Sequence, residues 1–136
     1  MTGDLRAVLD TGAVMAYAHG VDTVGEVLVQ AADAKAEVWL PSTCLIEAYS
    51  LLDFDEFAVV GLLRANPVVV VVPPERVHNG DDFPAIGGMA RRAGRLGAGH
   101  AAFLAMSRAA EVVTSRPDQI RAALLDNWPV IEVLTP

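Results

Sequence analysis

The chain has 136 residues, of which 53% are apolar, and its 17 acidic and 10 basic residues give a net charge of −7. This composition fits one folded domain of ordinary size, and it is not that of a disordered chain. The negative charge disfavours general attraction to polyanions, and the single cysteine excludes an internal disulfide bond and zinc sites built from several cysteines.

The sequence gives no sign of membrane insertion or export. No apolar run reaches the length of a membrane-spanning helix. Asp4 and Asp10 interrupt the segment in which a signal peptide needs an unbroken apolar stretch. We therefore expect a cytoplasmic protein with no membrane partner.

The charges are unevenly divided along the chain. Residues 1–68 hold ten acids and three bases, whereas residues 69–136 hold seven of each. If RNA binds, we expect it to approach the second half, with Arg91, Arg92 and Arg95 as phosphate contacts. The alternative is that these arginines belong to a solvated helix face.

The first predicted strand, residues 5–9, is followed by Asp10, and the small residues after it open a helix that breaks at Gly20. In an open parallel sheet, ligands bind beyond the carboxyl ends of the strands, so this acid points into the expected site. Thr11 is a candidate helix N-cap, and Gly12 keeps the turn tight. The alternative is that Asp10 is itself the N-cap, because aspartate is a preferred residue there.

The next segments continue the alternation of helix and strand. Apolar residues at helical spacing predict a helix over residues 23–35, and residues 37–41 form a short strand that a proline ends. Ser42 or Thr43 then caps a helix in which Glu47 stands among apolar residues. An acid on or beside an apolar face is unusual unless it is paired or coordinates a cation.

The rest of the chain is predicted to form helices over residues 55–65, 82–96, 100–109 and 119–125, and strands over residues 68–72, 111–114 and 130–134. The β-branched run 68–72 predicts a strand buried on both faces. Residues 75–80 form a loop, and Gly97-Ala98-Gly99 separates two helices.

The alternation of strands and helices predicts an α/β protein. We expect one domain over residues 1–136, with a three-layer α/β/α fold and a central, mostly parallel five-stranded sheet.

Three short motifs coincide with this pattern. They are Asp10-Thr11 after the first strand, Glu47 in the helix after Pro41, and Val112-Val113-Thr114-Ser115-Arg116-Pro117-Asp118 near the C-terminus. Together, in length, element order and spacing, they resemble the PIN domain, the fold of VapC-type toxins from bacterial toxin–antitoxin pairs. The resemblance implies a PIN-like endoribonuclease in which a cluster of acids holds one or two Mg²⁺ or Mn²⁺ ions. Such ions prefer oxygen ligands, activate water and neutralise charge that develops on a phosphate.

The resemblance assigns roles to individual residues. Asp10 matches the family's first acid and Glu47 its second, so both are expected to be metal ligands and catalytic. Thr114 matches the hydroxyl residue found just after the fourth strand, and it is the third catalytic candidate. Asp118 becomes a further metal ligand if its loop shifts.

Two positions depart from the family pattern. His100 stands where a third acid usually opens an alanine-rich helix, and Arg116 stands in place of the fourth acid. An arginine instead of an acid changes the local charge by two units, which opposes a divalent cation. We therefore expect a weakened or altered metal site, or no metal, with Arg116 acting as a counter-ion to Asp10 or Glu47. His100 is expected to be neutral near a helix start, and it either bonds a neighbouring carboxylate or ligates Mn²⁺ or Zn²⁺.

Two functions stay open at this point. The first is a metal-dependent ribonuclease that acts as the toxin of a VapBC-type pair, with a cognate antitoxin as partner. The second is a catalytically inactive PIN-like module that binds RNA or a protein. A haloacid-dehalogenase-like or response-regulator-like domain also places an acid after the first strand, but it needs a late lysine, and none follows Lys35. The resemblance also implies a homodimer.

Overall fold

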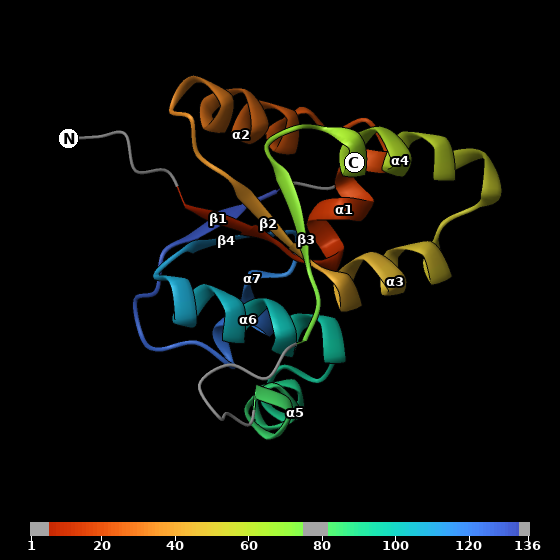
Figure 1. Ribbon diagram of the computed structural model, residues 1–136. Helices are drawn as coiled ribbons and strands as arrows, with labels where there is room; N and C mark the ends of the chain where they lie inside the picture. The colour runs from red at the N-terminus through yellow and green to blue at the C-terminus, as the bar shows by residue number, and fades with distance from the viewer. Residues whose placement is uncertain (1–5, 75–81, 134–136) are drawn as a thin grey trace.

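A parallel sheet forms the centre of the molecule in the computed structural model, which describes residues 6–74 and 82–133 (Figure 1). The order of the strands is β3-β2-β1-β4-β5, and every pairing between them is parallel. The α/β class, the five strands and the three layers are thus confirmed. The strands are β1 (Ala7–Leu9), β2 (Val38–Pro41), β3 (Val69–Val72), β4 (Glu111–Thr114) and β5 (Val130–Glu132).

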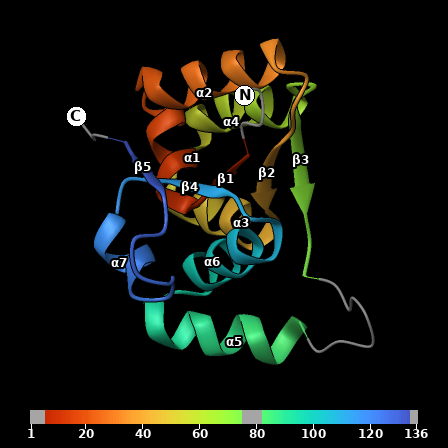
Figure 2. The same cartoon turned by 90° about the vertical axis from the view of Figure 1, so that its left-hand side faces the viewer.

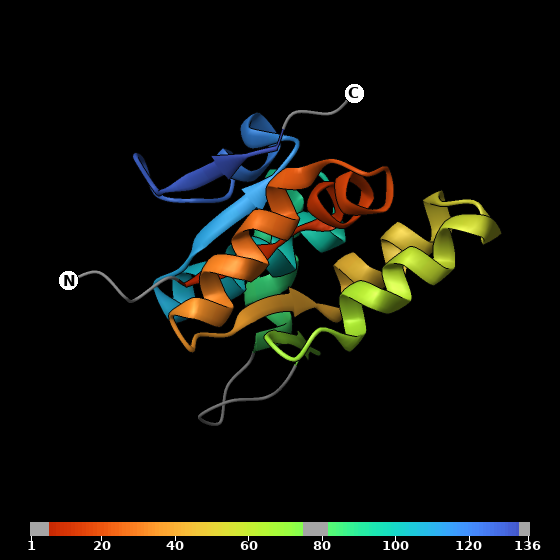
Figure 3. The ribbon, with the colours of Figure 1, turned by 90° about the horizontal axis from the view of Figure 1, so that it is seen from above.

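Helices cover both faces of this sheet. They are α1 (Thr11–Ala18), α2 (Asp22–Asp33), α3 (Ser42–Leu51), α4 (Phe57–Ala65), α5 (Asp82–Ala93), α6 (Leu96–Arg108) and α7 (Pro117–Arg121), with a short 3-10 helix η1 (Phe54–Glu56) before α4. On one face α6 contacts β1, β2 and β4, and α5 packs on its outer side (Figure 2). On the other face, α1 and α2 lie over the strands (Figure 3). Helix α3 contacts both α1 and α6.

The position of each strand explains its burial. All three residues of β1 are buried, because β1 is the central strand and helices cover both of its faces. The prediction that residues 68–72 are buried on both faces is wrong. Strand β3 is at the edge of the sheet, and Val69 alone among its four residues is buried. A run of valines indicates a strand but does not tell an edge from a centre.

The helix break in the second half also differs from the prediction. Gly97-Ala98-Gly99 does not separate two helices, because α6 already begins at Leu96. The break falls at Gly94, whose φ of +86° is a conformation that glycine adopts readily. Gly99 lies inside α6. A larger residue does not fit there, because an added Cβ would collide with the backbone of Ala90 in α5. Close packing of the two helices, not a turn, requires this glycine.

The remaining predicted elements are present, with bounds that differ by a few residues. Ser42 and Thr43, the expected caps, lie inside α3, whose N-cap is Pro41 without a side-chain bond. The predicted strand ends at residues 5 and 134 and the predicted loop over residues 75–80 lie outside the described residues. Within the described ranges, no helix combines the length and apolar character that crossing a bilayer requires.

We expect Gly99→Ala to lower the free energy of unfolding by about 1–3 kcal/mol, because the added methyl group overpacks the contact between α5 and α6. Gly88→Ala is the matched control, since Gly88 is an exposed residue of α5 with open space around an added Cβ. This control should raise the free energy of unfolding by roughly 0.5–1 kcal/mol. Urea denaturation measures both, and equal effects of the two substitutions would contradict the close helix approach.

Candidate functional site

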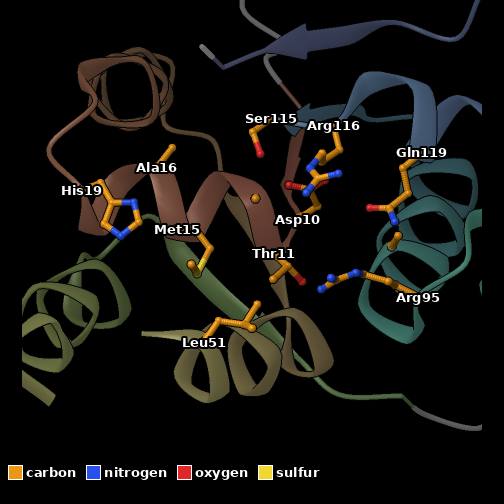
Figure 4. A pocket seen from close by; sticks show the side chains of 12 residues that line it. Asp10, Thr11, Met15, Ala16, His19, Leu51, Arg95, Ser115, Arg116 and Gln119 are labelled. Carbon is orange, nitrogen blue, oxygen red and sulfur yellow. The ribbon is translucent and has the colours of Figure 1, made fainter. Parts of the chain in front are cut away.

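The order of the strands places a crevice between β1 and β4. From β1 the chain continues to β2 and β3 on one side, and it returns to β4 and β5 on the other. In open parallel sheets, ligands bind beyond the carboxyl ends of the strands at such a reversal. A cavity of about 370 Å³ opens there, lined by Asp10 after β1 and by Ser115 and Arg116 after β4 (Figure 4).

Asp10 is the one acidic residue among the described residues that line this cavity, and it is only 3% exposed. It is the N-cap of α1, because the Ala13 N–H donates to its Oδ1 at 2.9 Å. Burial raises the pKa of Asp10 to about 6, although hydrogen bonds from Thr114 and from the amides of Ala13 and Gly12 lower it. The negative charge of Glu47 raises it further. Asp10 is therefore the cap, as the alternative interpretation proposed, and it also lines the cavity.

Glu47 does not line the cavity but supports one of its walls. Its Oε1 accepts a hydrogen bond from the Thr11 hydroxyl at 2.8 Å, and its Oε2 accepts one from the Gly97 N–H at 3.1 Å. The first turn of α6 has no side-chain cap from Arg95, so Glu47 of α3 supplies an acceptor that this turn lacks. An added Cβ on Gly97 would collide with the Glu47 carboxylate and lie 2.7 Å from Thr11 Oγ1. Thr11 is thus a partner of Glu47 and not the cap of α1.

Thr114 connects the ends of β1 and β4. Its side chain is fully buried, it bonds Asp10, and its Oγ1 accepts a hydrogen bond from the Arg116 N–H at 2.8 Å. The start of α1 lies against the same loop, because an added Cβ on Gly12 would collide with the side chain of Ser115. Gly12 therefore allows close approach of α1 to the segment after β4.

Two arginines share the cavity with Asp10. Arg116 lies beside Asp10 after β4, and Arg95 reaches the cavity from the segment between α5 and α6 (Figure 4). No ion pair joins Arg116 to Asp10 or Glu47 in the described part of the chain, so the expected counter-ion contact is not present in this structure. Arg91 and Arg92 are exposed in the last turn of α5 and do not line the cavity.

His100 and Asp118 do not line the cavity at Asp10. His100 is the fifth residue of α6 and not its start, and its Nδ1 is 2.7 Å from the Thr43 hydroxyl. Burial lowers the pKa of His100 to about 4, so the imidazole is neutral at physiological pH. It lines a second cavity of about 300 Å³, together with residues such as Phe103. Asp118 is exposed in the first turn of α7 and does not line the cavity at Asp10.

The sequence interpretation missed several lining residues. Met15 and His19 follow Thr11 at intervals of four residues, so they lie on the same face of α1. The lining also includes Ala16 of α1, Leu51 of α3, Ala98 of α6 and Gln119 of α7. The spacing along α1 was a signal for Met15 and His19, whereas the contributions of α3 and α7 depend on how the helices pack.

These residues do not fit a centre for a divalent cation. Mg²⁺ and Mn²⁺ take about six oxygen ligands, and carboxylates that supply some of them also balance the charge of the ion. Among the described residues Asp10 is the single lining acid, each Glu47 oxygen already accepts a hydrogen bond from another helix, and two guanidinium groups oppose a cation nearby. Among the described residues, one group of three acids could hold an ion, and it consists of Asp53, Asp55 and Glu56, outside this cavity.

Comparison with protein-family models and with curated protein sequences finds no match for this chain. The resemblance to PIN domains therefore stays a prediction.

We expect Asp10→Asn to stabilise the protein at pH 7.5. The folded state binds the Asp10 proton more tightly than the unfolded state does, so wild-type stability falls as pH rises from about 4 to about 6. A shift from 3.8 to about 6 corresponds to about 3 kcal/mol at most. Asparagine keeps the helix cap and removes the titration.

The difference in the free energy of unfolding between Asp10→Asn and wild type should be largest above pH 6 and should vanish near pH 4. Denaturation across this range measures it. Asp118→Asn is the matched control, because it makes the same change at an exposed acid outside the cavity. A difference in the free energy of unfolding that stays constant with pH would contradict a buried Asp10 carboxyl with a raised pKa.

We expect Glu47→Ala to lower the free energy of unfolding by about 3 kcal/mol, because it removes two hydrogen bonds to a charged group. Glu47→Gln should lose less, since the amide can still bond both Thr11 and Gly97. Thermal or urea denaturation distinguishes the two variants. A loss of under about 1 kcal/mol for alanine would show that the carboxylate does not hold the helices together.

Proposed function

We propose that this chain is a PIN-like module that binds the phosphates of RNA in the cavity beyond β1 and β4, without metal-dependent cleavage. The observation that carries the proposal is the pair of guanidinium groups, Arg95 and Arg116, beside a single buried acid. In the family that the sequence resembles, metal ions neutralise the phosphate at this place. Here the arginines supply that positive charge.

Arginine is suited to this role. Its planar guanidinium group donates several hydrogen bonds in a geometry that matches phosphate oxygens, and it stays charged at all physiological pH values. Both residues are exposed and can reach a ligand, and neither forms an ion pair with another described residue. Arg91 and Arg92, exposed near the end of α5 that precedes Arg95, can contact further phosphates of the same strand.

The negative charge of the whole molecule restricts the proposed RNA binding to the arginines that contact the strand. With a net charge of −7, the protein repels a polyanion at long range, so affinity depends on the few arginines that contact it. This supports specific binding in the cavity over general adhesion of RNA to the surface. The antitoxin partner and the homodimer that the resemblance implies stay predictions.

The test is fluorescence anisotropy with a labelled, short single-stranded oligouridylate. We expect the wild-type protein to bind it and Arg116→Ala to weaken binding by about tenfold or more, because a hydrogen bond to a charged group contributes roughly 1.5–3 kcal/mol. The slope of log affinity against log salt should also become shallower by about 0.7 for each phosphate that the variant no longer neutralises.

Arg64→Ala is the matched control, because it removes the same charge from an exposed residue of α4 that does not line the cavity. Its affinity should stay within about twofold of wild type. An equal loss in both variants would mean that RNA responds to overall charge and not to the cavity. Absence of binding by the wild-type protein would reject the proposal.

A parallel assay with Mg²⁺ or Mn²⁺ tests the alternative, a metal-dependent ribonuclease. We expect no cleavage of the oligonucleotide with either ion. Cleavage by the wild-type protein that disappears in Asp10→Asn would replace the binding module with the enzyme. Cleavage that persists in Asp10→Asn would indicate a contaminating nuclease.

A further inference from the structure

The cavity has two ends of different chemistry. Figure 4 shows Arg95, Ser115, Arg116 and Gln119 on one side, and His19, Met15, Ala16 and Leu51 on the other. Helix α1 spans the distance between them, since Asp10 is its N-cap and His19 its C-cap. At 1.5 Å per residue these two positions are about 13 Å apart. The cavity is therefore elongated, with a cationic end and an end that is mainly apolar.

Leu51 and Met15 make the second end suitable for a flat apolar group. Leu51 is 53% exposed although it is a large aliphatic residue, and it lines the cavity. Met15 is partly buried, and its flexible thioether adapts to ring surfaces. Nothing on this side of the described lining carries a negative charge.

The His19 ring is held in place at this end. Its Nε2 is 3.0 Å from Glu56 Oε2, while the other oxygen of Glu56 accepts a hydrogen bond from the Asp53 N–H at 2.9 Å. Glu56 is thus fixed by the capping box of η1, and it fixes the imidazole in turn. The His19 side chain is still 40% exposed. An ordered aromatic ring with a free surface is what a stacked nucleobase needs.

We propose that the cavity holds one unpaired RNA nucleotide, with its base stacked on His19 beside Met15 and Leu51 and its phosphate between Arg95 and Arg116. This inference rests on the proposed RNA binding and adds the part of the ligand that gives selectivity. The volume of about 370 Å³ lies within the range of pockets that enclose small ligands. A paired base cannot leave its stack without breaking the duplex, so the site selects single strands.

The experiment compares two labelled oligomers of equal length and charge, an oligoadenylate and an abasic ribose phosphate chain. We expect wild-type protein to bind the oligoadenylate about tenfold more tightly, as stacking on one aromatic side chain predicts. His19→Ala should remove this preference and leave the affinity for the abasic chain unchanged. His19→Phe should keep part of it, because phenylalanine retains a ring for stacking but loses the contact with Glu56 that orients the imidazole.

Phe83→Ala is the matched control, since Phe83 is an exposed ring on α5 that does not line the cavity. It should keep the full preference for oligoadenylate. Thermal unfolding of each variant confirms that it is folded at the temperature of the assay.

The outcomes separate the two proposals. Equal binding of both oligomers by the wild-type protein, with loss of both in Arg116→Ala, would overturn the stacking site and leave phosphate binding intact. A preference for bases that persists in His19→Ala would also overturn it. Failure of both oligomers to bind would reject phosphate binding and the stacking site together.

Discussion

The Glu47 carboxylate is the contact on which the geometry of the cavity depends. It joins α3 to the start of α1 through Thr11 and to the first turn of α6 through Gly97. Helix α1 follows β1 and α6 precedes β4, so this one side chain connects the helices next to the two strands at whose ends the cavity lies. The Cys44 thiol adds a bond to the Gly97 carbonyl at 3.1 Å, which strengthens the same junction. A partly buried polar cluster of this kind is most stable when each donor finds its acceptor.

Asp10, unlike Glu47, lowers the stability of the folded protein at neutral pH. Its carboxyl is buried and its pKa is raised, so the ionised form destabilises the folded protein at neutral pH. Asparagine would cap α1 as well without this penalty. Residues that lower stability where a neutral substitute would serve are typical of functional sites. The position of Asp10 in the crevice between β1 and β4 is consistent with that interpretation.

The charges around Asp10 support the proposal of phosphate binding rather than metal-dependent catalysis. Acids that converge on one point favour a cation centre, but here Glu47 accepts hydrogen bonds from two other helices and Asp118 is outside the cavity. Arg95 and Arg116 give the cavity a positive end instead. His19, Met15 and Leu51 give it an end suited to a base, and the two together match the two parts of a nucleotide. Helix α1, which Asp10 caps, runs between these two ends of the cavity.

Local sequence patterns determined much of this protein. The alternation of apolar runs predicted the five strands and the α/β class, and the acid after β1 was correctly placed at the carboxyl edge of the sheet. These features depend on periodicity and on chain direction, which neighbouring residues specify. Tertiary structure decided the rest. The edge position of β3, the break at Gly94, the burial of His100 against Thr43 and the use of Glu47 as a link between helices all depend on contacts between distant residues. Motif spacing cannot show which of two acids faces the cavity and which faces a helix end, because the packing of α3 against α1 and α6 makes that choice.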